Sequence, residues 1–302
     1  MRYAIIGAGA IGGYYGGLLS RVADVTFIAR GATLTALRER GIVLYESGAT
    51  TTLPVDAAAD ATALSPVDVV VIATKSGGLR DALALAAPLI AQGAVVMPVQ
   101  NGVEAPHVVA EVTPIDRIVP CVVRGFLELV GPAEIAYHGG PRSFTFGSWN
   151  GTASALVDAI AADIAAAGFE GIVHPNIWID VWRKAMFVVP FGALGALTDQ
   201  PLGILRTTLR VDLGAAMREV FEVARAMNVA LPDDAVDATL AFADAMPADA
   251  TTSMQRDILA GLASELDSQV GGIVRLAARS DVPVPLLGVM DRVLRLRPGQ
   301  AG

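Results

Sequence analysis

The chain of 302 residues contains a single cysteine, Cys121, so an internal disulfide is excluded. Cys121 lies in an apolar run, which favours a buried structural thiol over a nucleophile. Histidine is almost as scarce, and the three histidines are scattered along the chain without the spacing of a metal site. We therefore expect neither a disulfide framework nor a bound metal.

Charged side chains are also few, at 17% of the residues, and the net charge is −8. Binding to nucleic acid requires clustered lysine and arginine, so this balance argues against a nucleic-acid partner. Long apolar runs are absent too, whereas a membrane-spanning helix needs about 20 apolar residues. Because the N-terminus leads into a short apolar strand instead of a signal-peptide helix, a cytoplasmic protein without a membrane segment is expected.

The first half of the chain alternates short apolar segments with segments of helical periodicity, a pattern typical of a parallel sheet covered by helices. The expected strands are 3–6, 25–29, 67–74, 94–99 and 118–123. The expected helices between them are 11–22, 33–40, 79–90 and 103–112. Short β-like segments between residues 125 and 149 predict an antiparallel addition to the sheet edge. A helix at 153–167 and a strand at 171–174 follow.

The second half predicts helices only. After Pro175, apolar residues recur at three- and four-residue spacing over 176–196, 205–227, 233–245 and 253–279. Prolines separate these segments. We therefore predict one domain over residues 1–175 and a second, all-helical domain over residues 176–302.

The strongest local signal is a glycine motif that directly follows the first strand and opens the first helix. Its residues are Gly7, Ala8, Gly9, Ala10, Ile11 and Gly12. Gly7 permits a tight turn, Gly9 lets the backbone approach a pyrophosphate, and Gly12 permits close packing of helix and strand. The free N–H groups at the helix N-terminus favour phosphate. The motif predicts dinucleotide binding and hence an α/β fold: an N-terminal Rossmann-type sheet domain followed by an all-helical C-terminal domain.

The end of the second strand indicates which dinucleotide is bound. Chains that bind NAD usually have an acid there, which holds the ribose 2′-hydroxyl, whereas this chain has Arg30. An arginine can form a forked, charge-assisted contact with a 2′-phosphate. NADP(H) is therefore the predicted cofactor, and a solvated arginine at the strand end is the alternative.

Polar residues follow two further strands, at the edge of the sheet where ligands of open α/β folds bind. Thr74 and Lys75 come directly after one buried strand, and Asn101 follows the next. All three are candidate cofactor-binding residues, and Asn101 is also a candidate for substrate binding.

These residues, together with segments of the helical half, resemble the ketopantoate reductase family. The resemblance rests on GAGAIGG at 7–13, TKS at 74–76, QNGVE at 100–104, WRK at 182–184 and SMQRDILAGLASELD at 253–267. GGIVRL at 271–276 and VPVP at 282–285 also fit. The resemblance implies NADPH-dependent reduction of a 2-oxo acid to a 2-hydroxy acid, namely 2-dehydropantoate to pantoate in pantothenate biosynthesis.

The resemblance also implies the roles of three residues. Lys184 matches the general acid, whose ammonium gives a proton to the alkoxide that hydride transfer creates at C2. Glu265 matches an acid that binds the substrate hydroxyl and orients the lysine. Ser253 matches a serine that binds the substrate carboxylate, although the run 251–253 also has the composition of a helix cap.

The sequence departs from the family pattern where asparagines line the substrate pocket. Four and eight residues after the lysine it has Val188 and Gly192, and Ala250 stands about where a third asparagine is expected. Each lost hydrogen bond costs about 1 kcal/mol of binding to a polar substrate. A less polar 2-oxo acid is therefore the alternative substrate.

Two other functional classes remain open from the sequence. A β-hydroxyacid or opine-type dehydrogenase would join the same two kinds of domain, and a non-catalytic NADP-binding sensor would keep only the cofactor site. We expect NADPH and the 2-oxo acid to bind in a cleft between the domains. Apolar faces of the C-terminal helices are also compatible with a homodimer.

Overall fold

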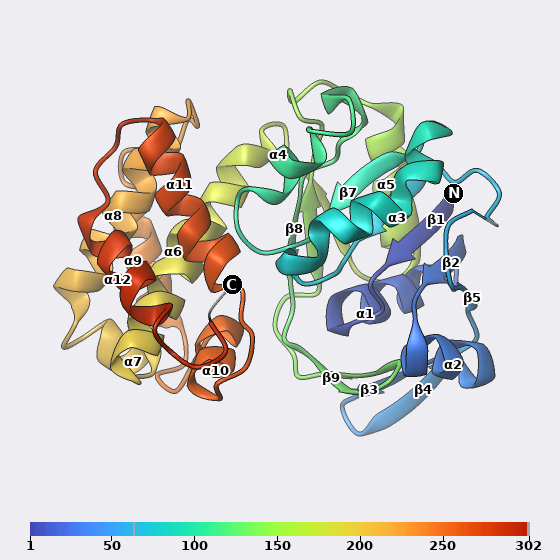
Figure 1. Ribbon diagram of the computed structural model, residues 1–302, viewed down its shortest axis with the longest axis horizontal. Helices are drawn as coiled ribbons and strands as arrows, with labels where there is room; N and C mark the ends of the chain where they lie inside the picture. Colours follow the sequence, from blue (N-terminus) through green and yellow to red (C-terminus); the bar gives the residue numbers. More distant parts are fainter. Residues whose placement is uncertain (63, 301–302) are drawn as a thin grey trace. The chain divides into compact units, whose positions relative to one another are not determined.

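The computed structural model describes residues 1–62 and 64–300 (Figure 1). Within them the chain forms two compact units. The first unit comprises Met1–Gln100 and Ala105–Ile177, and the second comprises Asn101–Glu104 and the chain from Trp178 onward. A single boundary does not describe this division, because the short segment Asn101–Glu104 belongs with the helices of the second unit.

The first unit is built on a five-stranded parallel sheet in the order β5-β2-β1-β6-β7. Its strands are β1 (Arg2–Ile6), β2 (Asp24–Ile28), β5 (Asp56–Ala58), β6 (Val69–Ile72) and β7 (Val95–Pro98). The helices that accompany it are α1 (Ala10–Leu19), α2 (Gly31–Arg40), α3 (Leu79–Ala91) and α4 (Ala105–Val109). This arrangement confirms the predicted parallel sheet with helical crossovers, except that the predicted strand over 118–123 lies outside this sheet and β5 takes the fifth place.

Alternate residues of the central strands enter two separate hydrophobic cores, because side chains of a strand point alternately to opposite faces. Ile5 and Val71 lie in one core, whereas Ala4 and Val70 lie in the other. All four residues of β6 are buried. Burial on both faces explains why these strands have continuous apolar sequences.

The prediction of an antiparallel addition to the edge of this sheet is wrong. The strands β9 (Leu127–Gly131) and β10 (Glu134–Tyr137) instead join a hairpin that the sequence did not reveal, in a four-stranded sheet of order β4-β3-β10-β9. The hairpin strands are β3 (Ile42–Glu46) and β4 (Ala49–Leu53). The turn between them has positive φ at both Ser47 and Gly48, which matches the twist of a two-residue hairpin.

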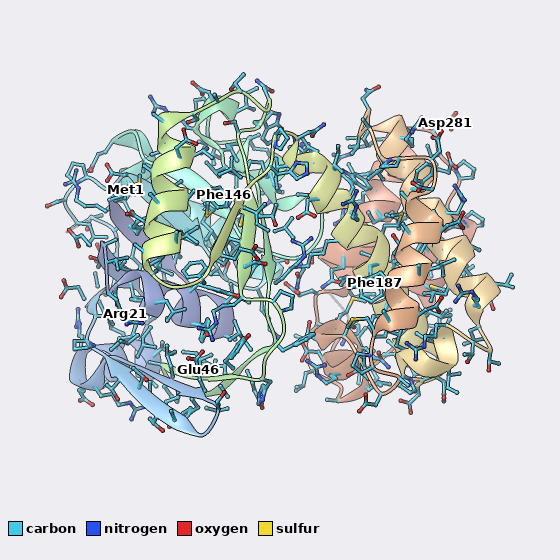
Figure 2. All side chains as sticks on the ribbon, turned by 180° about the vertical axis from the view of Figure 1, so that it is seen from behind. Met1, Arg21, Glu46, Phe146, Phe187 and Asp281 are labelled. Atoms are coloured by element: carbon cyan, nitrogen blue, oxygen red, sulfur yellow. The ribbon has the colours of Figure 1, made fainter. Side chains whose placement is uncertain are left out.

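A third, three-stranded sheet completes the first unit, in the order β12-β11-β8. Its strands are β8 (Cys121–Arg124), β11 (Ser143–Phe146) and β12 (Glu170–Val173), and α5 (Ala155–Ala166) precedes β12. Phe146, labelled in Figure 2, is completely buried, and Cys121 is buried as well.

The second unit is helical. Its helices are α6 (Ile177–Thr198), α7 (Leu202–Leu205), α8 (Arg210–Ala226), α9 (Ala235–Ala245), α10 (Ser253–Leu259), α11 (Gly272–Arg279) and α12 (Pro285–Leu294). Helix α6 continues through Pro190, and all of its residues from 189 to 196 are buried. No helix in the described part of the chain combines the length and the apolar character needed to cross a membrane.

The predicted single helix over 253–279 is wrong. Helix α10 ends at Leu259, and Gly261 then adopts a φ of +68°, which does not continue a helix. Helical structure resumes in the π-helix Asp267–Gly271, which leads directly into α11. Glu265 therefore lies in a non-helical segment just before the π-helix, where its backbone is not confined to a helix face.

Candidate functional site

The glycine motif forms the turn from β1 into α1. Gly7 has a φ of +103°, and a Cβ atom there would stand 2.7 Å from the backbone of Ala73 and Thr74. A Cβ atom at Gly12 would stand 2.0 Å from the carbonyl oxygen of Gly7. These two glycines are therefore required by the fold, because any side chain would push the helix away from the sheet.

Gly9 differs from the other two glycines of the motif. It is the N-cap of α1, no side chain caps the helix there, and a Cβ atom would meet nothing within 4 Å. Open space in front of uncapped N–H groups is what a pyrophosphate needs, since those groups and the helix dipole attract anions. The geometry of the turn thus fits the diphosphate of a dinucleotide.

Three other candidate cofactor residues, Arg30, Thr74 and Lys75, follow β2 and β6, the two strands that flank β1, and Asn101 follows β7. Arg30 is exposed and is the N-cap residue of α2. Lys75 is exposed and directly precedes a short 3-10 helix, Ser76–Gly78. Because parallel strands end at the same sheet edge, Arg30 and Lys75 lie on the same edge as Gly7.

Thr74 carries a second sign of a ligand at this edge. Its hydroxyl is buried without a hydrogen-bond partner among the described residues. The side-chain amide of Gln100 donates to the carbonyl oxygens of Ile72 at 3.0 Å and Thr74 at 3.1 Å, and so fixes the end of β6. Buried polar groups are rarely left unpaired, so a hydroxyl held in place without a partner fits a site that a ligand completes.

Three side chains from distant parts of the sequence meet in the second unit. The Nζ atom of Lys184, on α6, donates to Oδ1 of Asn101 at 2.8 Å. The Nδ2 atom of Asn101 donates in turn to Oε2 of Glu265 at 3.2 Å. The amide of Asn101 thus bridges the ammonium group and the carboxylate. All three residues are half-buried.

Glu265 has a further partner that the sequence did not suggest. The Nε2 atom of Gln269, in the π-helix, donates to the same Oε2 atom at 3.1 Å, and Gln269 is only 1% exposed. A glutamine four residues after an acid is the one signal that could have indicated this pair. Two donors on one oxygen hold the carboxylate of Glu265 in a fixed orientation.

The helix cap near Ser253 is confirmed, but its residue is a different one. Thr252 is the N-cap of α10, and its hydroxyl accepts a hydrogen bond from the backbone N–H of Gln255 at 3.0 Å. Ser253 is the first residue of the helix and is exposed. Within the described chain, no hydrogen bond engages the Ser253 hydroxyl, so capping does not compete with ligand binding there.

The departures from the family pattern have a structural counterpart at Gly192. A Cβ atom there would stand 2.7 Å from the Cε atom of Met254 and 2.8 Å from the hydroxyl oxygen of Thr252. The space that an asparagine side chain would occupy is therefore filled by α10 and its cap. Val188, one helical turn after Lys184, is half-buried.

Comparison with protein families identifies the family of the chain as a whole. The family model described as "Ketopantoate reductase PanE/ApbA" matches residues 3–151, and the model of its C-terminal part matches residues 176–297. The chain belongs to the ketopantoate reductase family. It is an oxidoreductase, as the family's members are. The predicted family and enzyme class are thereby confirmed.

Individual relatives match over nearly the full length of this chain and of their own. The 2-dehydropantoate 2-reductase of Mesorhizobium japonicum is 30% identical over 98% of this chain and 96% of its own. A crystal structure of a PanE/ApbA family ketopantoate reductase from Ralstonia eutropha has a TM-score of 0.87 and 31% identity, covering 98% of both chains. A D-mandelate dehydrogenase structure with NADH and anilino(oxo)acetate has a TM-score of 0.88 but 20% identity, so it supports the fold alone.

Proposed function

We propose that this chain reduces a 2-oxo acid to the 2-hydroxy acid with NADPH, and that the 2-oxo acid is 2-dehydropantoate. The observation that carries the proposal is the hydrogen-bonded chain from Lys184 through Asn101 to Glu265, because it presents an oriented acid for a carbonyl oxygen. The first unit would be the cofactor-binding domain, and the second would be the substrate-binding and catalytic domain.

The cofactor would be held by the first unit. The N–H groups that follow Gly9 would bind the diphosphate, Arg30 would bind the 2′-phosphate, and the residues Thr74 and Lys75 would contact the remainder. When bound, NADPH supplies the hydride that reduces C2 of the substrate. The open space at Gly9 and the unpartnered hydroxyl of Thr74 both support this placement.

The second unit would supply the proton and hold the acid. Lys184 would donate a proton from Nζ to the oxygen on C2 as that oxygen gains negative charge. Asn101 would hold the ammonium group in a fixed orientation towards that oxygen, and Glu265 would accept a hydrogen bond from the substrate hydroxyl. The exposed hydroxyl of Ser253 would bind the carboxylate.

Arg30→Glu is expected to shift the cofactor preference from NADPH towards NADH by at least about tenfold, because it replaces an attraction to the 2′-phosphate by a repulsion. The measurement is the ratio of kcat/KM for the two cofactors. Arg21→Glu is the matched control, since Arg21 is an exposed cation of the same unit, labelled in Figure 2, and the substitution changes the net charge equally. An unchanged preference in the Arg30 variant would remove the 2′-phosphate role.

A second candidate substrate is a 2-oxo acid of similar shape without the hydroxyl group. It is favoured by the apolar side chain of Val188, where the family pattern has an asparagine, and by the filled space at Gly192. The two substrates can be compared directly, since 3,3-dimethyl-2-oxobutanoate differs from 2-dehydropantoate only in lacking the hydroxyl.

We expect kcat/KM to be at least about fivefold higher for 2-dehydropantoate, the contribution of one hydrogen bond to the hydroxyl. A higher kcat/KM for 3,3-dimethyl-2-oxobutanoate would replace the substrate and keep the reaction. Absence of turnover with both compounds, and with a wider panel of 2-oxo acids, would contradict the proposed reaction itself.

A further inference from the structure

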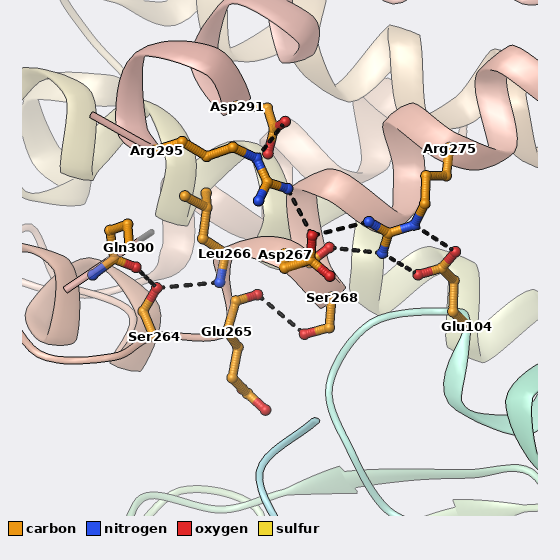
Figure 3. Close-up of polar contacts among 10 residues, drawn as sticks. All are labelled: Glu104, Ser264, Glu265, Leu266, Asp267, Ser268, Arg275, Asp291, Arg295 and Gln300. Carbon is orange, nitrogen blue, oxygen red and sulfur yellow. Dashed lines mark hydrogen bonds and ion pairs between the residues drawn. The ribbon is translucent and has the colours of Figure 1, made fainter. Parts of the chain in front are cut away.

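A chain of ion pairs in the second unit runs from Asp291 through Arg295 and Asp267 to Arg275 of α11 and on to Glu104 (Figure 3). The guanidinium group of Arg275 donates two hydrogen bonds to Glu104, from Nη2 to Oε2 at 2.6 Å and from Nε to Oε1 at 3.2 Å. This forked contact reaches the segment Asn101–Glu104, which also carries Asn101. A forked arginine–carboxylate pair fixes direction as well as distance.

The same guanidinium group holds the segment that carries Glu265. Its Nη1 atom donates to Oδ1 of Asp267 at 3.0 Å, and its Nη2 atom donates to the backbone carbonyl of Asp267 at 2.9 Å. Asp267 lies two residues after Glu265. Arg275 therefore joins the two segments that present Asn101 and Glu265 to Lys184.

Arg295 of α12 extends the chain without reaching the Asn101 segment. Its Nη2 atom donates to Oδ1 of Asp267 at 2.7 Å, and its Nε atom donates to Asp291 at 2.9 Å. Arg295 and Arg275 are similarly exposed, at 31% and 38% of their side chains. The two arginines thus share a partner and a degree of burial, but only Arg275 touches Glu104.

Three glycines make this close packing feasible. A Cβ atom at Gly272 would stand 2.9 Å from Oε2 of Glu104, and one at Gly271 would stand 2.7 Å from Nη2 of Arg295. Gly102 has a φ of +95°, and its Cβ atom would stand 2.9 Å from the carbonyl oxygen of Ser268. The Asn101 segment therefore lies directly on the backbone of the π-helix.

The charges of the chain reinforce one another. The hydrogen bond to Glu104, above all, raises the pKa of Arg275. Burial alone would raise the pKa of Asp267, but hydrogen bonds from Arg295 and Arg275 outweigh it and lower that pKa. Both partners therefore remain charged throughout the neutral pH range.

We propose that Arg275 is a positioning residue of the active site. It holds the segment Asn101–Glu104 against the segment Glu265–Asp267, so that the amide of Asn101 keeps its hydrogen bond with Lys184. This inference rests on the proposed function, in which Lys184 is the acid. Among the described residues, Arg275 makes no hydrogen bond or ion pair with Lys184, Asn101 or Glu265. It acts through Glu104 and Asp267 on the backbone that presents two of them.

Arg275→Met is expected to lower kcat about tenfold or more, since small displacements of catalytic groups have large effects on rate. The dissociation constant of NADPH should stay within about twofold, because the glycine motif, Arg30, Thr74 and Lys75 lie in the other unit. Arg295→Met is the matched control: it removes two ion pairs of the same unit and should leave kcat within about twofold. Equal losses of kcat in the two variants would overturn the positioning role.

A second variant keeps the test valid if Arg275→Met folds poorly. Glu104→Gln preserves the shape of the side chain and weakens only the contact with Arg275. It should lower kcat in the same direction, and the double variant should be no slower than Arg275→Met alone, because both substitutions break one connection. Losses of kcat that simply add would contradict the shared mechanism.

Backbone amide order parameters from NMR relaxation test the connection without any catalytic assay. For residues 101–104 they should fall from about 0.85, the value for rigid backbone, towards about 0.6 in Arg275→Met and Glu104→Gln, but not in Arg295→Met, because only the first two release the segment. Unchanged order parameters in both variants would overturn the inference even if the enzyme is active. Lowered order parameters in a protein that turns over no 2-oxo acid would support the connection and contradict the proposed function instead.

Discussion

Lys184→Ala is expected to lower kcat about 100-fold or more, while the dissociation constant of NADPH should change little. The reason is that general acid catalysis contributes about this factor, and alanine offers no proton to the oxygen on C2. Asn101, which now accepts from the ammonium group at 2.8 Å, loses that donor but keeps its contact with Glu265. Steady-state kinetics with saturating NADPH, together with a fluorescence titration of the cofactor, measures both quantities.

Arg183→Ala is the matched control for this substitution. Arg183 is the neighbouring cation on α6, and it is exposed. Its removal should leave kcat within about twofold, because exposed charges away from a site contribute little. If Lys184→Ala loses NADPH binding and thermal stability instead of kcat, the lysine is a structural residue and another group must supply the proton.

Gly12→Ala is expected to abolish measurable NADPH binding and to lower the Tm by about 10 °C, since overpacking against a rigid neighbour costs several kcal/mol. The added Cβ atom would stand 2.0 Å from the carbonyl oxygen of Gly7, which is backbone and cannot rotate away. Helix α1 would have to move from the sheet, and its N-terminal N–H groups would move with it. Calorimetry and a cofactor titration provide the two readouts.

Gly9→Ala separates binding from folding at the same turn. Nothing lies within 4 Å of the added Cβ atom, so the Tm should change by about 2 °C at most. NADPH affinity should still fall about tenfold or more, because the methyl group would occupy the space required by the diphosphate. Normal NADPH affinity in this variant would place the diphosphate elsewhere.

The parallel sheet was predictable because burial on both faces leaves a direct record in the sequence. Strands such as β6 and β7 are continuous apolar runs, and the glycine motif marks the turn after β1. The hairpin of β3 and β4 was not predictable by the same rule. Most of β4 is exposed and threonine-rich, so it shows no apolar alternation, and its turn is only two residues long.

The candidate site could be predicted as a set of residues but not as an arrangement. Lys184 and Glu265 were found through the family resemblance and Asn101 through its position after a strand, yet the bridge formed by Asn101 spans 83 residues to one partner and 164 to the other. No local pattern encodes contacts over such separations. The break after α10 was missed for a related reason: helical apolar spacing continues across Gly261, although its positive φ ends the helix.

Hydride transfer to C2 is the central claim, and isotope transfer tests it most directly. The purified chain would be incubated with 2-dehydropantoate and with NADPH carrying deuterium at C4 of the nicotinamide, in the 4R and 4S forms separately. Mass spectrometry and proton NMR of the product then locate the label. We predict one deuterium at C2 of pantoate from one of the two forms and none from the other. Pantoate that contains no deuterium from either form, or no reduced product from any 2-oxo acid, would contradict the account.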